Sequence, residues 1–164
     1  MSKMLIVYYS WSNGNTEGIA KELQRVTGAD IVRIDTVIPY TGSYDEVVEQ
    51  GKNEVNKGYQ PTIRPLDVDI SKYDIVAIGT PTWWYTMAPA VRTFLNSYNW
   101  RGKTVIPFMT NGGWPGHVIQ DMKKACEGAN FACEMEIKFD SNGGDCLESS
   151  EVEIREWMEA VKKL

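Results

Sequence analysis

The chain has 164 residues, a formal net charge of -5 and 43% hydrophobic residues, which fits one domain with its own core, expected to span residues 1–164. The acidic balance argues against nucleic acid as a partner, because phosphate backbones are held by clustered Lys and Arg. With no membrane-length or signal-type apolar segment, a cytoplasmic protein without membrane contact is expected. Cys126, Cys133 and Cys146 form no C-x-x-C pair, so no disulfide framework and no metal site is indicated.

The first predicted strand is the apolar run 4–9, and a helix carrying Ile19 and Leu23 follows it. The loop between them suits a bound phosphate, because backbone N–H groups at a helix start and short hydroxyl and amide side chains point into one space. It lacks the Lys of a nucleoside-triphosphate loop and the three glycines of a dinucleotide loop, which leaves a monophosphate. A plain turn with a helix cap explains this loop alone equally well. The candidate phosphate ligands are Ser10, Trp11, Ser12, Asn13, Gly14, Asn15 and Thr16.

The next segments predict an outer strand and a second helix. Residues 30–35 mix apolar and charged side chains, as expected for a short strand near a sheet edge. Ser43 with Glu46 forms a capping box, which begins a helix that ends before Pro61. Residues 58–72 have no periodicity and predict a surface connection that could cover a ligand.

Two solidly apolar strands follow, and each ends in an unusual loop. Residues 75–79 predict a central parallel strand, and residues 80–87 predict a loop that leads to a helix starting at Pro89. Residues 105–109 predict a second inner strand, with a bulge expected at Pro107 because proline lacks a backbone donor. Its exit, residues 110–116, is glycine-rich and again leads into a helix.

The last strand, residues 131–139, alternates apolar and polar side chains and so belongs at an edge. A closing helix begins at the capping box of Ser150 and Glu153. Alternating strands and helices of this kind predict an α/β fold: a doubly wound five-stranded parallel sheet of order 2-1-3-4-5 with helices on both faces. In that order the exits of strands one, three and four share one crevice.

The three loops together describe a ligand with a phosphate at one end and a planar ring at the other. Flavin mononucleotide (FMN) is such a ligand, since its ring would stack on the aromatic side chains of the second loop and meet the glycine backbone of the third. Taken singly, an aromatic core plug and a plain turn explain these loops, whereas their convergence favours the flavin. The further candidate FMN ligands are Pro81, Thr82, Trp83, Trp84, Tyr85, Thr110, Asn111, Gly112 and Gly113.

With these motifs, the chain resembles the flavodoxin family over nearly its whole length. The resemblance is carried by Tyr9-Ser10 with Gly14-Asn15-Thr16, by Gly79-Thr80-Pro81-Thr82-Trp83-Trp84 and by Thr110-Asn111-Gly112-Gly113. It implies an FMN-binding electron carrier or flavin-dependent reductase, with the phosphate on the first loop and the ring between the other two. The first loop is one residue longer than the usual pattern, Asn111 replaces a usual Ser, and Trp114-Pro115 is extra.

Three functions are open on these residues. We favour an electron carrier that serves a redox partner protein or a small-molecule acceptor, because few basic residues near the loops could hold a nicotinamide phosphate. The alternative is an FMN-dependent NAD(P)H:quinone-type oxidoreductase, for which His117 is either a proton donor or a plain solvated residue at a helix start. A flavin-free signalling domain is weakest, because the first and third strands end without the acidic residues that magnesium needs.

Overall fold

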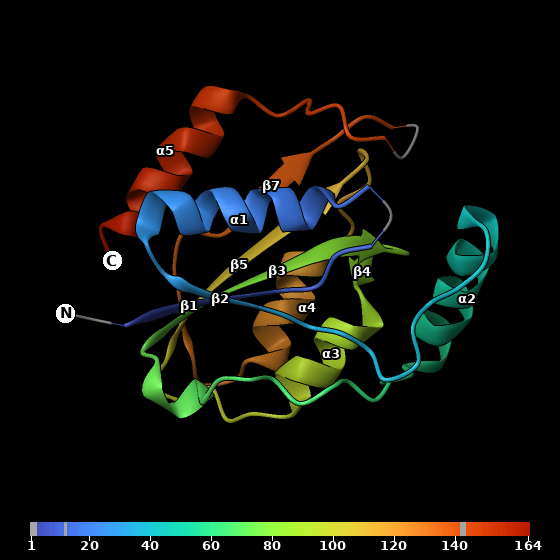
Figure 1. Cartoon of the computed structure of the whole chain (residues 1–164), viewed down its shortest axis with the longest axis horizontal. Helices are drawn as coiled ribbons and strands as arrows, with labels where there is room; N and C mark the ends of the chain where they lie inside the picture. The colour runs from blue at the N-terminus through green and yellow to red at the C-terminus, as the bar shows by residue number, and fades with distance from the viewer. Residues whose placement is uncertain (1–2, 12, 142–143) are drawn as a thin grey trace.

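The computed structural model describes residues 3–11, 13–141 and 144–164, and Figure 1 shows a twisted sheet with helices around it. The strands are β1 (Met4–Tyr8), β2 (Asp30–Arg33), β3 (Ile75–Trp83), β4 (Thr86–Met87), β5 (Thr104–Asn111), β6 (Asn130–Phe131) and β7 (Met135–Lys138). The helices are α1 (Asn15–Thr27), α2 (Tyr44–Lys57), α3 (Pro89–Asn96), α4 (Val118–Ala125) and α5 (Glu151–Lys162), with a short 3₁₀ helix at Ile70–Lys72.

The predicted doubly wound parallel sheet is confirmed. β1 lies between β2 and β3, and β5 pairs with β3, all in parallel. The fifth strand of the predicted order is divided, because β6 and β7 each pair in parallel with β5. The exits of β1, β3 and β5 therefore lie side by side at one edge of the sheet, as a 2-1-3-4-5 order requires.

The irregularity expected at Pro107 lies in the neighbouring strand and not in β5. Pro107 pairs with Ile78 in an unbroken register between β5 and β3. On its other side, the pairing of β5 shifts by one residue between β6 and β7. There the Val105 carbonyl accepts a hydrogen bond from the Ala132 N–H. Residues two positions apart in a strand face the same neighbouring strand, so the Pro107 nitrogen, which carries no hydrogen, also points to this side. The backbone donor that Pro107 lacks is therefore opposite the gap between β6 and β7, where Cys133 has a φ of 52°.

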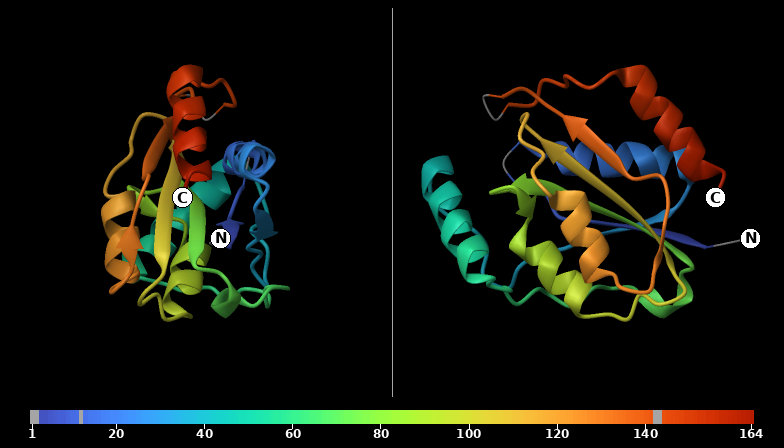
Figure 2. Two further views of the ribbon diagram at one scale, coloured as in Figure 1. Left: turned by 90° about the vertical axis from the view of Figure 1, so that its left-hand side faces the viewer. Right: turned by 180° about the vertical axis from the view of Figure 1, so that it is seen from behind.

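Helices cover both faces of the sheet, as predicted (Figure 2). α1 and α5 cover one face, where Leu23 and Trp157 pack in the same core cluster as Ala77 of β3. α3 and α4 cover the other face, where Phe94 and Met122 join the second cluster. Both faces of the inner strands are buried, which explains why their sequences are apolar without alternation.

Helix α2 stands apart from this layered arrangement, beyond the carboxyl ends of the strands (Figure 1). It begins as predicted, because the Ser43 hydroxyl accepts from the Glu46 N–H at 3.2 Å. Its buried residues are Val47 and Gly51. The other side chains of the helix are available to line the space around the strand ends.

The segment after residue 79, expected to be a loop, is a β-hairpin. β3 continues to Trp83, where it pairs with Thr86 of the antiparallel β4. The two residues between them, Trp84 and Tyr85, have φ values of 51° and 69°. Positive φ at both central positions is the type I′ hairpin turn, which Asn and Gly normally form. Trp84 and Tyr85 carry no local signal for such a turn, so contacts with other segments must hold this conformation.

No helix in the described part of the chain is long and apolar enough to cross a membrane. Within the same residues, no group of three or more His, Cys, Asp or Glu side chains is placed to hold a metal ion.

The described cysteines differ in burial, and this predicts their reactivity. Burial raises the pKa of the Cys126 thiol to about 12. Cys146 is exposed, and the nearby Asp140 carboxylate raises its pKa as well. Because the thiolate is the reactive form, we expect iodoacetamide to leave Cys126 unlabelled in the folded protein and to label Cys146 slowly at pH 7 and faster as the pH rises. Mass spectrometry of tryptic peptides measures both, and fast labelling of Cys126 at pH 7 would contradict the fold.

Candidate functional site

A cleft of about 340 Å³ lies where the exits of β1, β3 and β5 meet. Its walls come from all three loops that the sequence singled out, which confirms that they converge. The candidate ligands on its surface are Trp11, Asn13, Asn15, Thr16, Pro81, Thr82, Trp83, Trp84, Tyr85, Thr110, Asn111 and Gly112.

Three of the remaining candidates lie beside the cleft, and one lies outside the described residues. Ser10 is buried, and its hydroxyl accepts from the Glu17 N–H at 3.2 Å. Gly14 caps α1 with a φ of 74°. The Gly113 N–H donates to the Asn111 side chain at 2.7 Å. Ser12 is the candidate that the structure does not describe. The ligand role of every candidate, whether on the cleft surface or beside it, stays a prediction.

The first loop places the start of α1 at the cleft. Gly14 adopts the left-handed conformation immediately before the helix, so the first helical residues, Asn15 and Thr16, face the cleft. The Thr16 hydroxyl is 2.8 Å from that of Thr110, and the Asn15 amide donates to the Gly144 carbonyl at 3.0 Å. The positive end of the helix dipole and two polar side chains therefore meet at one end of the cleft.

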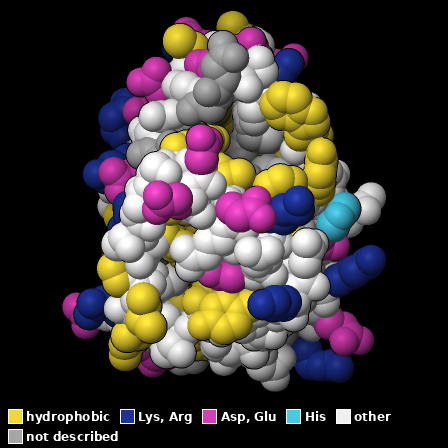
Figure 3. Space-filling view, turned by 90° about the vertical axis from the view of Figure 1, so that its right-hand side faces the viewer, with side chains coloured by type: hydrophobic (Ala, Val, Ile, Leu, Met, Phe, Trp, Pro, Cys, Tyr) yellow, Lys and Arg dark blue, Asp and Glu magenta, His cyan; other side chains and the backbone are white. Residues whose placement is uncertain are grey.

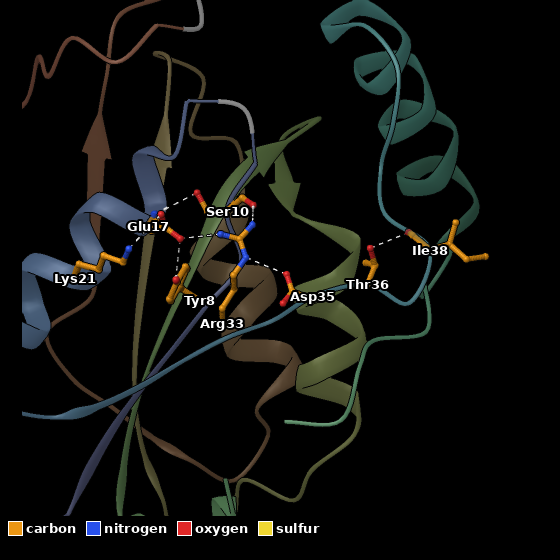
Figure 4. A network of polar contacts seen from close by, with 8 residues as sticks. All are labelled: Tyr8, Ser10, Glu17, Lys21, Arg33, Asp35, Thr36 and Ile38. Atoms are coloured by element: carbon orange, nitrogen blue, oxygen red, sulfur yellow. Dashed lines mark hydrogen bonds and ion pairs between the residues drawn. The ribbon is translucent and has the colours of Figure 1, made fainter. Parts of the chain in front are cut away.

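A charged network beneath this loop holds its first residue (Figure 4). Arg33 of β2 donates to the Ser10 carbonyl at 2.8 Å and forms ion pairs with Glu17 and Asp35. A hydrogen bond from Tyr8 and the nearby Arg33 lower the pKa of the Glu17 carboxyl. Arg33 is therefore balanced by two carboxylates, one of which, Glu17, also pairs with Lys21 at 3.5 Å, and Arg33 serves to shape the loop.

Trp83 forms the inner aromatic wall and is held on several sides. Its ring meets those of Tyr9, Tyr40 and Trp11 edge-on, with centroid distances of 5.9, 4.9 and 6.2 Å. Helix α2 approaches it so closely at Gly51 that a Cβ there would lie 3.1 Å from the indole. Such edge-to-face packing favours one fixed ring orientation. Trp83 is thus a rigid surface.

The hairpin presents Trp84 and Tyr85 at the outer side of the cleft. The Trp84 indole donates to the Val48 carbonyl of α2 at 2.8 Å, and the His117 N–H donates to the Tyr85 carbonyl at 2.8 Å. Gly116, with a φ of 57°, allows this approach, because a Cβ there would lie 2.3 Å from the Tyr85 oxygen. These contacts, from two other segments, hold the strained turn in place.

Several lining residues were absent from the sequence-based candidates. α2 contributes Tyr44, Val47, Val48 and Gly51, although its own sequence shows only ordinary helix signals. The chain after β7 contributes Phe139, Asp140, Ser141 and Gly144, and Trp114 adds a half-exposed indole. The Asp140 carboxylate accepts from the Gly144 and Cys146 N–H groups, at 2.8 and 3.1 Å, which shapes this loop. In the sequence, only the turn-forming run Asp-Ser-Asn-Gly-Gly at 140–144 could have indicated a loop at this place.

Comparison with known proteins agrees with this geometry. A family model described as Flavodoxin matches residues 3–161. A flavodoxin of Haemophilus influenzae is 29% identical over 84 residues, which make up 51% of this chain and only 34% of that protein. A candidate flavoprotein from Bacteroides eggerthii has a TM-score of 0.78 at 28% identity and covers 98% of both chains. An FMN complex of a flavoprotein from Lactobacillus acidophilus has a TM-score of 0.70 at 22% identity, over 83% of this chain and 93% of that one. Because the family model spans nearly the whole chain, this chain belongs to the flavodoxin family.

Proposed function

We propose that this protein binds FMN and transfers electrons. One observation carries the proposal: a helix N-terminus suited to a phosphate and indole walls suited to a flat ring open into the same cleft. The cleft volume of about 340 Å³ is within the range of cofactor sites. The solved relative from Lactobacillus acidophilus is an FMN complex, which supports the same cofactor here.

The residues divide into two groups with different roles. Asn15, Thr16 and the backbone of the first loop would hold the phosphate with neutral donors, since Arg33 is already paired. Trp83 and Trp84 would hold the ring and keep water from its faces. Bound FMN supplies one- and two-electron redox chemistry, which the protein environment tunes.

The cofactor itself gives the first test. We expect the purified protein to be yellow and to release FMN on denaturation, because the described residues of the site offer one phosphate cradle and no second one. Mass spectrometry of the released ligand distinguishes FMN from FAD. Release of FAD, or no binding after reconstitution with excess FMN, would overturn the assignment.

We further propose that the protein is a carrier that exchanges electrons with a partner. Helix starts, aromatic rings and amides line the cleft, and Asp140 is its one charged lining residue among those described. A bound nicotinamide phosphate would need cations. We therefore expect no rapid oxidation of NADH or NADPH by the purified protein with a quinone and no added reductase. Rapid turnover in that assay would favour the reductase instead. A single-domain organisation, a cytoplasmic location and the absence of nucleic-acid binding stay predictions.

A further inference from the structure

A second hollow, of about 840 Å³, lies on the other side of α2 from the FMN cleft. We call it the α2 groove. It shares no lining residue with the cleft. Its walls are one face of α2 and the two extended segments 37–40 and 59–62; the lining residues are Val37, Ile38, Tyr40, Glu46, Glu49, Gln50, Asn53, Glu54, Lys57, Tyr59, Pro61 and Thr62.

The wall that α2 gives to the groove is a stripe along most of the helix. The lining positions of α2 run from Glu46 to Lys57 at helical spacing, so they form one stripe. At 1.5 Å per residue this stripe is about 16 Å long. Five residues of extended chain, at about 3.3 Å each, have the same length.

The wall opposite the helix exposes apolar side chains to solvent. Ile38 is 82% exposed, Tyr59 51% and Val37 46%. The backbone behind them is already paired, since the Val37 N–H donates to the Thr62 carbonyl at 2.9 Å. The wall therefore offers side chains, and not a free strand edge, to an occupant. Figure 3 looks onto the side of the molecule where α2 lies and shows hydrophobic side chains among acidic and basic ones.

The helix wall carries a net negative charge, because its three carboxylates outnumber its one ammonium group. Glu46, Glu49 and Glu54 line it with Lys57, and in the described part of the chain none of these carboxylates forms an ion pair. Glu54 instead accepts neutral hydrogen bonds from Tyr40 at 2.6 Å and from Gln50 at 2.8 Å. An occupant that complements this wall carries positive charge, and one that complements the opposite wall carries apolar groups.

Building on the proposed electron-transfer function, we propose that the α2 groove docks an extended basic and apolar segment of a redox partner protein. The groove is joined to the FMN cleft through side chains. Tyr40 lines the groove, and its ring is 4.9 Å from that of Trp83, which lines the cleft. A partner segment that contacts Tyr40 is therefore separated from the cleft by the rings of Tyr40 and Trp83. It also lies along α2, which lines the cleft with its other face.

The test uses the full FMN-loaded chain and the peptide acetyl-Lys-Leu-Lys-Leu-Lys-amide, with acetyl-Glu-Leu-Glu-Leu-Glu-amide as the control peptide. We expect saturable ¹⁵N amide shifts confined to residues 37–40, 46–57 and 59–62 with the basic peptide alone. Glu49→Lys should weaken this binding about tenfold. Ile38→Ser should weaken it also, without loss of stability, because Ile38 is exposed. Glu159→Lys makes the same charge change on an exposed site of α5 and should leave binding unchanged.

Other outcomes would overturn the docking proposal. These are equal binding of the acidic peptide, shifts centred on Trp84 and Trp114, or an unchanged affinity in Glu49→Lys. Sedimentation that shows a dimer broken by Ile38→Ser would assign the groove to a second copy of the chain. FMN affinity, measured separately by flavin fluorescence, should be the same in Glu49→Lys and in the original chain, so failure of the groove and failure of the cofactor assignment are distinguishable.

Discussion

Gly116→Ala should both destabilise the protein and weaken FMN binding, because the new methyl group would overlap the backbone of the hairpin at Tyr85. A Cβ at Gly116 would lie 2.3 Å from the Tyr85 carbonyl oxygen and 2.5 Å from its Cα. Backbone atoms cannot rotate away as a side chain can, so the hairpin that carries Trp84 must shift. The left-handed conformation adds about 1–2 kcal/mol, and overpacking a further 1–3 kcal/mol, to the loss in the free energy of unfolding.

Gly28→Ala is the matched control for this substitution. Gly28 has a φ of 72° at the end of α1, and a Cβ there would meet nothing within 4 Å. It should therefore cost only the conformational part, about 1–2 kcal/mol, and leave FMN affinity unchanged. Urea unfolding and fluorescence titration with FMN measure the two effects. If both variants lost the same stability and kept full FMN affinity, the hairpin would not depend on Gly116.

Thr16→Val should separate FMN from riboflavin, which is the same flavin without its phosphate. Thr16 is buried at the end of the cleft where α1 begins, and valine keeps its shape while removing the hydroxyl. A direct hydrogen bond to a charged phosphate is worth roughly 1.5–3 kcal/mol, so FMN affinity should fall about 10- to 150-fold. Riboflavin affinity should change little.

Thr110→Val tests the other explanation for such a loss. It breaks the same 2.8 Å hydrogen bond between Thr16 and Thr110 but leaves the Thr16 hydroxyl in place. If that bond merely supports the fold, both variants should weaken FMN and riboflavin alike. If Thr16 serves the phosphate, only Thr16→Val should discriminate between the two ligands. Calorimetric titration of both flavins into each variant decides between these outcomes.

Local rules in the sequence were sufficient for the order of the sheet and for the place of the first loop between β1 and α1. Unbroken apolar runs predict strands buried on both faces, and the order of mixed and solid strands places β1, β3 and β5 together. The helix starts at Ser43 and Ser150 were also predictable, because a capping box involves residues only three positions apart.

Only the tertiary structure decided the features that depend on distant contacts. The hairpin at Trp84 and Tyr85 needs positive φ at two bulky residues, a conformation that no local signal predicts and that Gly116 and Val48 hold from other segments. Arg33 reaches Ser10 across 23 residues of sequence.

The position of α2 also could not be predicted from the sequence. Its amphipathic pattern shows that one face is buried, but not which part of the protein packs on that face. The fold sets Val47 and Gly51 toward the FMN cleft and the Glu46–Lys57 stripe toward the α2 groove. The sequence by itself therefore determined the three converging loops and their suitability for FMN. Packing between distant segments determined the shape of the cleft and the surface beside it, because side chains far apart in the chain meet only after folding.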